Sequence, residues 1–329
     1  MIVTLTANPS IDRTVELSGP LVRGAVQRAT RVTAEPGGKG VNVARAVNAA
    51  GQLVVAVLPS QSEDPLVLAL REQQVPYRPV PVPGAVRVNL TVAEPDGTTT
   101  KINELGSPLT PEVLVQLEEV LRREAGAARW AVLSGSLPPG VPDDWYATLV
   151  RSLRDTGCSI AVDTSGAPLS ALMEAGSDAA PDLLKPNSEE LAQITGLDAD
   201  ALEADPRAAA AAARLLLERG LRAVLASLGA RGAVLVTADG AWLATPPPIV
   251  ARSTVAAGDS ALSGYLLADL AGAGPEDRLR NAVAYGAGAA ALPGSMMPTP
   301  GETQPDAVVV EALDLDVSIA AASPGLAES

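Results

Sequence analysis

Short apolar runs along the chain alternate with segments in which apolar residues recur every three or four positions. The runs predict buried strands, and the three-to-four spacing predicts amphipathic helices. Strands are predicted at residues 2–6, 53–58, 131–134, 159–162, 182–184 and 223–227. Helices are predicted at residues 40–50, 64–74, 111–125, 143–156, 188–196 and 206–220. This alternation predicts an α/β fold with a mostly parallel sheet covered on both faces, in which ligands bind beyond the carboxyl ends of the strands.

Two segments interrupt the alternation, at approximately residues 12–33 and 86–103. The second contains two short strand patterns around the turn Pro95-Asp96-Gly97, so we expect both segments to form a small β-lid rather than core. The proline-rich connection at residues 75–84 is either a stiff hinge or a surface loop. We therefore predict a single domain over residues 1–315 and a flexible tail at residues 316–329.

The composition narrows the classes of function. A formal net charge of −14 argues against a nucleic-acid partner. No apolar run approaches the roughly 20 residues that span a bilayer, and the N-terminus lacks a basic segment followed by an apolar one. The expected location is therefore the cytoplasm, with no membrane partner. With no histidine and a single cysteine, Cys158, the usual zinc sites, an intramolecular disulfide and histidine acid–base chemistry are excluded.

A glycine-rich motif, EPGGKGVN at residues 35–42, stands directly before a predicted helix. Its spacing matches neither the P-loop nor the dinucleotide motif G-x-G-x-x-G. Glycines let a backbone approach a ligand closely, and a helix N-terminus near an ammonium group favours anions or polar hydroxyls. The alternative is a Gly-Gly turn that only begins the helix.

Two further motifs follow predicted strands. In KPNSEE, residues 185–190, Asn187 and Glu190 match a helix-capping arrangement, or they could hold water around Mg²⁺. SLGARG, residues 227–232, is either a tight turn or a nucleotide-binding loop. Each motif alone is weak evidence.

One carboxylate, Asp259, lies in the segment TVAAGDSALSGY, residues 254–265, ahead of a helix-like run. Aspartate is a favoured helix N-cap, which would need no function. Together, however, the glycine turns, the candidate Mg²⁺ pair and this carboxylate are the parts that phosphoryl transfer requires.

The order of these motifs resembles the PfkB or ribokinase-like sugar kinases, and within them the branch of bacterial 1-phosphofructokinases and tagatose-6-phosphate kinases. The resemblance extends over residues 1–315 and rests on TANPSID, EPGGKGVNVARA, VRVNLTV, GTTTKINELG, LSGSLPPG, VDTSG, LLKPNSEEL, SLGARGA, STVAAGDS and AVAYGAGAAALPGSMMPTP. It implies a ribokinase-like three-layer α/β/α sandwich with a small β-lid.

The resemblance also implies roles for individual residues. Asp259 would be the base for the acceptor hydroxyl, and the backbone N–H groups of Ala257, Gly258 and Asp259 would form an anion hole. Mg²⁺ would be organised by Asn187 and Glu190 through water. ATP would be bound by Lys185, Ser227, Leu228, Gly229, Ala230, Arg231, Gly232, Gly258 and Asn281. The phosphosugar would be bound by Asp12, Arg28, Gly37, Gly38, Lys39, Asn42, Arg87, Asn89, Lys101 and Asn103.

One position departs from the family's usual glycine-alanine-glycine-aspartate, because Ala256 replaces the first glycine. If this position needs a positive φ, alanine strains the turn by about 1 kcal/mol or more. We expect activity to be retained, since the three following residues are intact.

The implied reaction is the ATP-dependent conversion of D-fructose 1-phosphate to fructose 1,6-bisphosphate. Tagatose 6-phosphate and fructose 6-phosphate are alternative substrates, because each also carries one phosphate and one free primary hydroxyl. A non-catalytic sugar-phosphate-binding regulator is the alternative of another class, motivated by Ala256. The alternating apolar and polar residues of the second lid segment also suggest a homodimer through the lid.

Overall fold

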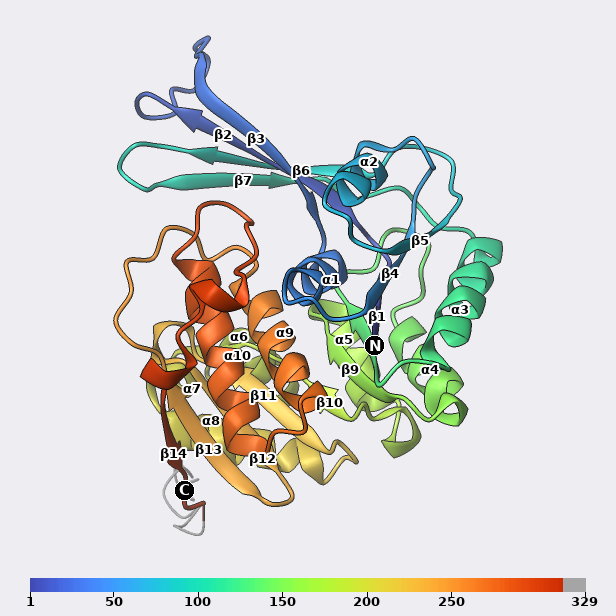
Figure 1. Cartoon of the computed structure of the whole chain (residues 1–329), viewed down its shortest axis with the longest axis vertical. Coiled ribbons are helices and arrows are strands. Elements are labelled where there is room, and N and C mark those ends of the chain that lie inside the picture. Colours follow the sequence, from blue (N-terminus) through green and yellow to red (C-terminus); the bar gives the residue numbers. More distant parts are fainter. Residues whose placement is uncertain (316–329) are drawn as a thin grey trace, which may run out of the picture.

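The computed structural model describes residues 1–315 and is organised around a ten-stranded sheet with the order β14-β13-β12-β11-β10-β9-β8-β1-β4-β5 (Figure 1). The strands from β11 back to β5 in this order are parallel, whereas β12, β13 and β14 are antiparallel additions at one end. Their bounds are β1 Ile2–Thr6, β4 Val54–Pro59, β5 Tyr77–Val80, β8 Trp130–Ser134, β9 Ser159–Asp163, β10 Leu183–Leu184, β11 Ala223–Ser227, β12 Ala233–Thr237, β13 Gly240–Thr245 and β14 Val309–Ala312.

Helices cover both faces of this sheet, each over its own apolar core. On one face lie α1 Lys39–Ala49, α2 Pro65–Glu72, α9 Ala257–Leu270 and α10 Pro275–Ala290. On the other lie α3 Pro111–Ala125, α4 Trp145–Leu153, α5 Gly166–Glu174, α6 Ser188–Thr195, α7 Ala199–Ala204 and α8 Pro206–Leu217. Short 3₁₀ turns occur at Arg154–Thr156, Ser177–Ala179, Gly229–Arg231, Pro300–Glu302 and Pro305–Ala307. The predicted three-layer α/β/α sandwich is confirmed.

The local sequence explains why these elements pack as they do. In α3, Val113, Leu117 and Leu121 recur at four-residue spacing and are buried on one side of the helix, which begins with Pro111 at its first position. In β1, Ile2 contributes to one core while Val3 contributes to the other, as the two-residue periodicity of a strand requires. Within residues 1–315, no helix has both the length and the apolar character needed to cross a bilayer.

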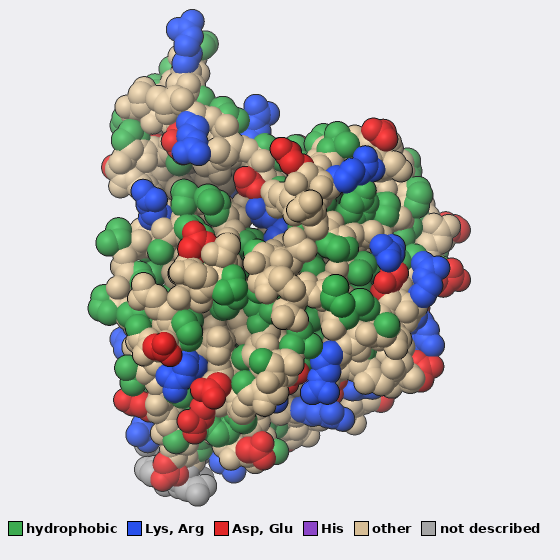
Figure 2. All heavy atoms as spheres, in the orientation of Figure 1, with side chains coloured by type: hydrophobic (Ala, Val, Ile, Leu, Met, Phe, Trp, Pro, Cys, Tyr) green, Lys and Arg blue, Asp and Glu red, His purple; other side chains and the backbone are tan. Residues whose placement is uncertain are grey.

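The lid is a separate four-stranded sheet with the order β3-β2-β6-β7. Its strands are β2 Ser10–Leu17, β3 Ala29–Gly37, β6 Arg87–Ala93 and β7 Thr99–Asn103. The lid projects from the body above α1 and α9 (Figure 1), and it forms a distinct lobe of the surface (Figure 2). Both segments that interrupt the predicted alternation therefore belong to one sheet.

The surface-loop interpretation of residues 75–84 was wrong for residues 77–80, whereas residues 75–76 and 81–84 have no regular secondary structure. Residues 77–80 form β5, which pairs with β4 in parallel at the edge of the central sheet. Proline is compatible with an edge strand because one side of the strand needs no backbone donor. The predicted tail, residues 316–329, lies outside the described residues.

Candidate active site

The N-terminus of α9 presents Asp259 from an unusual turn. Ala256 is the N-cap residue and has φ 61° and ψ 4°, whereas Asp259 is the third residue of the helix. The interpretation of Asp259 as the N-cap was therefore wrong. Its side chain is 6% exposed and its Oδ2 accepts a 2.8 Å hydrogen bond from Nδ2 of Asn42 in α1. The first N–H groups of a helix have no intrahelical acceptor, so those of Gly258 and Asp259 are available to an anion, while the N–H of Ala257 makes a long 3.5 Å contact with the carbonyl of Thr254.

The electrostatic surroundings of Asp259 raise its pKa to about 6. Burial is the largest cause, followed by repulsion from the carboxylate of Asp163. Lys39, the hydrogen bond from Asn42, and Lys185 oppose this shift. A carboxylate with a pKa close to neutrality is suited to act as a general base, because it is ionised at pH 7 and still has appreciable proton affinity.

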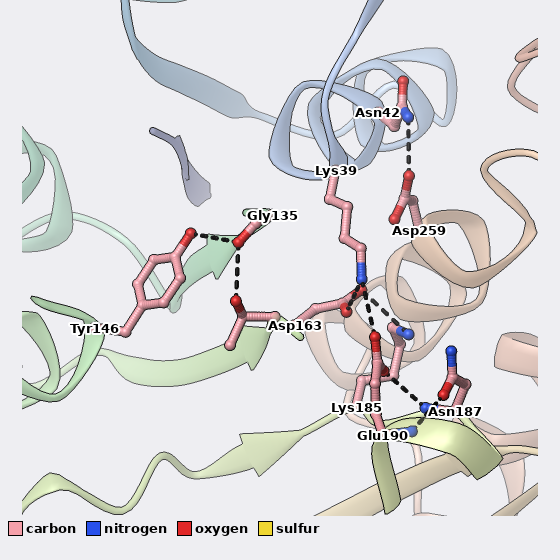
Figure 3. Close-up of polar contacts among 10 residues, drawn as sticks. Lys39, Asn42, Gly135, Tyr146, Asp163, Lys185, Asn187, Glu190 and Asp259 are labelled. Carbon is pink, nitrogen blue, oxygen red and sulfur yellow. Dashed lines mark hydrogen bonds and ion pairs between the residues drawn. The ribbon is translucent and has the colours of Figure 1, made fainter. Parts of the chain in front are cut away.

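Asp163, at the carboxyl end of β9, lies between two lysine ammonium groups (Figure 3). Its Oδ1 is 2.6 Å from Nζ of Lys39, and its Oδ2 is 3.1 Å from Nζ of Lys185. Burial would raise the pKa of Asp163, but Lys185 and Lys39 together hold it below its ordinary value. A Cβ placed on Gly258 would be 3.3 Å from Nζ of Lys185, so this ammonium lies directly beneath the start of α9. The helix N-terminus and the lysine thus form one positive region.

The side chains of Asn187 and Glu190 form a capping box at the start of α6. Oδ1 of Asn187 accepts from the N–H of Glu190 at 2.7 Å, and Oε2 of Glu190 accepts from the N–H of Asn187 at 2.9 Å. The capping interpretation is confirmed. Oε1 of Glu190 has no such role and lies 3.7 Å from Nζ of Lys39.

A divalent cation fits this position only as a largely hydrated ion. Among the described residues, no group of three or more acidic, histidine or cysteine side chains could enclose a metal. Mg²⁺ commonly keeps several waters and is bound by one or two carboxylates together with substrate phosphates. Oε1 of Glu190 is compatible with that kind of binding.

The loop after β11, residues 227–232, lies beside the α6 cap. Ser227 forms an isolated parallel bridge with Asn187, and Gly229–Arg231 form a 3₁₀ turn. The structure therefore brings this candidate nucleotide loop next to the candidate metal pair. Asn281 lies on α10 opposite Gly264, and its side chain donates to the carbonyl of Asp277 in its own helix. Its assignment to ATP still rests on the resemblance alone.

A cleft of about 590 Å³ lies between the inner face of the lid and the loops that precede α9 and follow α10. The lid register aligns Asp12 with Asn89 and Asn103, and it aligns Thr14 with Thr91 and Lys101. All six side chains line the cleft, opposite Arg252, Ser253, Thr254, Val255 and Ser295. Strand alternation therefore presents a polar surface to any ligand held under the lid.

Asp12 and Asn89 are fixed at the base of the lid. Oδ1 of Asp12 accepts from Oγ of Ser10 at 2.8 Å and from Nδ2 of Asn89 at 2.9 Å. Oδ1 of Asn89 is buried without a protein partner, so it can accept a hydrogen bond from a ligand hydroxyl. A Cβ on Gly37 would meet the Asp12 carboxylate at 2.3 Å, which explains the glycine there by close packing.

Several predicted sugar-binding residues have other contacts in this structure. Lys39 pairs with Asp163, and the amide of Asn42 is bonded to Asp259 rather than directed into the cleft. Arg87 donates to the carbonyl of Glu104, although its buried Nε has no partner. Arg28 is exposed in the loop between β2 and β3, outside the residues that line the cleft.

Sequence reasoning missed two residues of this site, Asp163 and Arg45. The signal for Asp163 was its position directly after a predicted buried strand, where ligands bind in such sheets. The signal for Arg45 was an isolated charge within the apolar helix VNVARAVNA.

Comparison with known proteins places this site in a family. The profile described as pfkB family carbohydrate kinase matches residues 5–301. The chain belongs to this family. It is 37% identical over 269 residues to a 1-phosphofructokinase of Xanthomonas campestris pv. campestris, covering 81% of this chain and 83% of that protein. It is also 33% identical over 308 residues to ATP-dependent 6-phosphofructokinase isozyme 2 of Escherichia coli, covering 92% of this chain and 96% of that protein.

A solved structure has the same fold. The tetrameric inhibited form of phosphofructokinase-2 from Escherichia coli superposes with a TM-score of 0.80 and 32% identity, covering 89% of this chain and 95% of that chain. The ribokinase-like fold is confirmed. As a pfkB family member, the protein is an ATP-dependent sugar kinase, and ATP is one of its substrates.

Proposed function

We propose that this kinase transfers the γ-phosphoryl group of ATP to the free primary hydroxyl of D-fructose 1-phosphate, giving fructose 1,6-bisphosphate and ADP. The observation that carries the proposal is the buried Asp259 carboxylate, whose pKa is raised to about 6 at the N-terminus of α9. A base for the acceptor hydroxyl and an anion-binding helix terminus are needed at the same point of such a reaction.

In the proposed reaction, Asp259 accepts the proton of the attacking hydroxyl. The sugar oxygen forms a bond to the γ-phosphorus while the bond from that phosphorus to the bridging oxygen of ADP breaks. The N–H groups of Ala257, Gly258 and Asp259 and the ammonium of Lys185 offset the negative charge on the transferred group. This role of Lys185 is supported by its burial, at 4% exposure, directly beneath Gly258.

We propose that the nucleotide phosphates enter with Mg²⁺, which supplies positive charge against the phosphate oxygens. Oε1 of Glu190 would hold the hydrated ion, while Asn187 keeps Glu190 oriented through the capping box. Ser227 to Gly232 would line the nucleotide site, which is supported by the bridge between Ser227 and Asn187.

The choice of fructose 1-phosphate rests on the resemblance to the 1-phosphofructokinase of Xanthomonas campestris pv. campestris, at 37% identity. The Escherichia coli relative is named a 6-phosphofructokinase, so fructose 6-phosphate is the main alternative, and tagatose 6-phosphate is a further one. Under the lid, Asp12 and Asn89 would hold sugar hydroxyls and Lys101 would attract the substrate's own phosphate. Measurement of kcat/KM for the three phosphosugars tests the choice, and a preference for fructose 6-phosphate would overturn it.

The test of the chemistry is ATP turnover by the wild type and by Asp259→Asn. Loss of a general base costs about 10²–10⁴-fold, so we expect the variant to lose turnover by at least that factor while it still binds the phosphosugar. Equal and negligible rates in both proteins, with phosphosugar binding intact, would instead support the non-catalytic regulator.

We further propose that two copies associate through the outer face of the lid. Val15, Leu90 and Val92 lie on the strand face opposite Asp12 and Asn89, and Val32 and Ile102 are 46% and 59% exposed. An exposed apolar sheet face of this kind favours association with the same face of a second copy. The tetrameric form of Escherichia coli phosphofructokinase-2 supports oligomer formation in this fold. We expect sedimentation to show a dimer that Ile102→Asp dissociates, and a wild-type monomer at micromolar concentration would refute the interface.

A further inference from the structure

Arg45 is a buried cation in the middle of α1. It is 7% exposed and its helix neighbours Val43, Ala44, Ala46 and Val47 are completely buried. Burial disfavours the charged guanidinium, and the pKa of Arg45 is lowered by this burial despite the nearby carboxylates of Glu35 and Asp12. A charge is retained in such a place only where its donors are well satisfied.

Three of its hydrogen bonds reach the lid and the cleft wall, and a fourth reaches the end of α2. Nη2 donates to Oε2 of Glu35 at 2.7 Å and Nη1 donates to the carbonyl of Pro36 at 3.0 Å, and both acceptors lie on lid strand β3. Nη1 also donates to the carbonyl of Ser295, at 3.1 Å, in the loop that lines the cleft. Nε donates to Oε1 of Gln73, at 2.9 Å, at the end of α2. Arg45 thus connects the root of the lid to the body.

Its fifth contact points toward the base. Nη1 lies 3.4 Å from Oδ1 of Asn42, one turn earlier in α1, and Nδ2 of Asn42 donates to Asp259. A guanidinium has donors and no acceptor, so it selects the oxygen end of the Asn42 amide. The amide nitrogen is then directed to Asp259, and the reversed amide would face Asp259 with an oxygen and Arg45 with a donor.

The geometry points to Arg45 as a positioning residue that fixes the Asn42 amide, and through it the Asp259 carboxylate, to lid strand β3. This inference rests on the proposed role of Asp259 as the base. Arg45 does not touch the reacting atoms, so its effect must pass through Asn42.

The consequence concerns the proton affinity of Asp259. Asn42 donates to the ionised carboxylate and so favours ionisation. The other charged groups that act on Asp259 are Asp163 from β9, Lys39 from α1 and Lys185 after β10, and none of them contacts Arg45. When Arg45 is removed, Oδ1 of Asn42 loses a donor that helps to fix it, so the Asn42 amide is held less firmly and its hydrogen bond to the ionised form of Asp259 is weakened. The acid limb of the kcat/KM profile then moves to higher pH.

The experiment is a double-mutant cycle on the full-length kinase, with the pH profile of kcat/KM as the readout. Arg45→Met and Asn42→Ala should each raise the midpoint of the acid limb by about half to one pH unit, the value of one hydrogen bond to the carboxylate. Because Arg45 acts through Asn42, the double variant should show only the shift of Asn42→Ala. Shifts that add in the double variant, or an unchanged midpoint in Arg45→Met, would overturn the inference.

Two further variants separate positioning from structural support. Gln73→Ala removes a partner of Arg45 on the side away from Asn42, so it should lower Tm and leave the midpoint unchanged. Arg45→Lys keeps a positive charge but not the planar guanidinium with its several donors. This variant should fold and give an acid-limb midpoint between those of the wild type and Arg45→Met. A wild-type midpoint in Arg45→Lys, or a Gln73→Ala midpoint as high as that of Arg45→Met, would contradict the inference. If Asp259→Asn still shows the acid limb of the kcat/KM profile, Asp259 is not the titrating base. That outcome would count against the proposed function and not against the positioning role of Arg45.

Discussion

Asn42 and Asp259 are 217 positions apart in the sequence, and the amide of one donates a 2.8 Å hydrogen bond to the carboxylate of the other. This contact joins α1, which begins directly after the lid strand β3, to the N-terminus of α9. Asp259, the residue proposed to deprotonate the sugar, is therefore held by α1, the helix that connects the lid to the body of the protein.

The raised pKa of Asp259 predicts the pH dependence of catalysis. Because its carboxylate must be ionised to accept a proton, kcat/KM should fall about tenfold per unit of pH below a midpoint near pH 6. A steady-state profile from pH 5 to 9 in the wild type measures this midpoint. An acid-limb midpoint near pH 4 would mean that burial and repulsion from Asp163 do not raise the pKa of Asp259.

Replacement of the base should also stabilise the fold above pH 6. A carboxyl whose pKa rises from 3.8 to about 6 on folding destabilises the native state progressively as pH rises between these values, and by a constant amount above them. Two pKa units correspond to at most about 3 kcal/mol. We expect Asp259→Asn to have a higher Tm than the wild type at pH 8 and the same Tm at pH 4. A lower Tm at pH 8 would contradict this expectation.

Ala256 stores backbone strain at the proposed anion hole. Its φ of 61° lies in the left-handed region, which costs a non-glycine residue about 1–2 kcal/mol, while glycine adds about 0.4–1 kcal/mol of unfolded-chain entropy. Ala256→Gly should therefore stabilise the protein by up to about 1 kcal/mol in urea unfolding. Gln74, with φ 55° and outside the site, is the matched control. Gln74→Gly should give a similar gain without changing kcat, and if Ala256→Gly loses activity, the methyl group has a role of its own.

Removal of the Asp163 carboxylate should affect stability and pH dependence together. Asp163→Asn leaves two ammonium groups without their shared partner, and breaking a buried pair of this kind costs roughly 3–5 kcal/mol. Asp163 also repels the Asp259 carboxylate, so its loss should move the acid limb of kcat/KM below pH 6. Urea unfolding and the pH profile measure the two effects. An upward shift of the limb would contradict the repulsion.

Lys101 should contribute to substrate affinity rather than to turnover. It lines the cleft beside Thr91 and Thr14, within reach of a ligand under the lid. Lys101→Met is expected to raise KM for the phosphosugar about tenfold or more, because an ion pair with phosphate is lost, with little change in kcat. Arg207 is exposed on α8, outside the lid and the cleft, so Arg207→Met is a charge-matched control that should leave KM unchanged. A similar KM effect in both variants would indicate only general attraction by positive charge.

Much of the fold was predictable because hydrophobic periodicity is a local signal. The parallel strands β1, β4, β8, β9, β10 and β11 follow from it, and the two lid segments follow from its interruption. Strand β5 was missed because the prolines of residues 75–84 indicate a loop, whereas an edge strand needs backbone donors on one side only. Strands β12 to β14 were not predicted, since antiparallel additions after β11 do not follow the alternation of strand and helix.

The site was predictable as a set of residues but not as a set of contacts. Periodicity and motif order indicated Asp259, Asn42 and Lys39, yet the sequence does not show that Asn42 bonds to Asp259. Nor does it show that Lys39 turns toward Asp163, because that pairing depends on the packing of α1 against the end of β9. Whether Ala256 is strained likewise depended on a backbone angle that only the folded chain defines.

The chain contains only three lysines, and all three lie in the candidate active site or the lid cleft. Lys39 and Lys185 form ion pairs with Asp163, and Lys101 lines the lid cleft. Lys185 is buried and the pKa of Lys39 is raised by Asp163, so Lys101 is the side-chain amine most open to acylation. Coupling this kinase to a sensor surface or a fluorophore through lysine amines would therefore modify the lid cleft that is proposed to bind the phosphosugar. Protection of Lys101 from acylation by a phosphosugar would in turn report occupancy of that cleft directly.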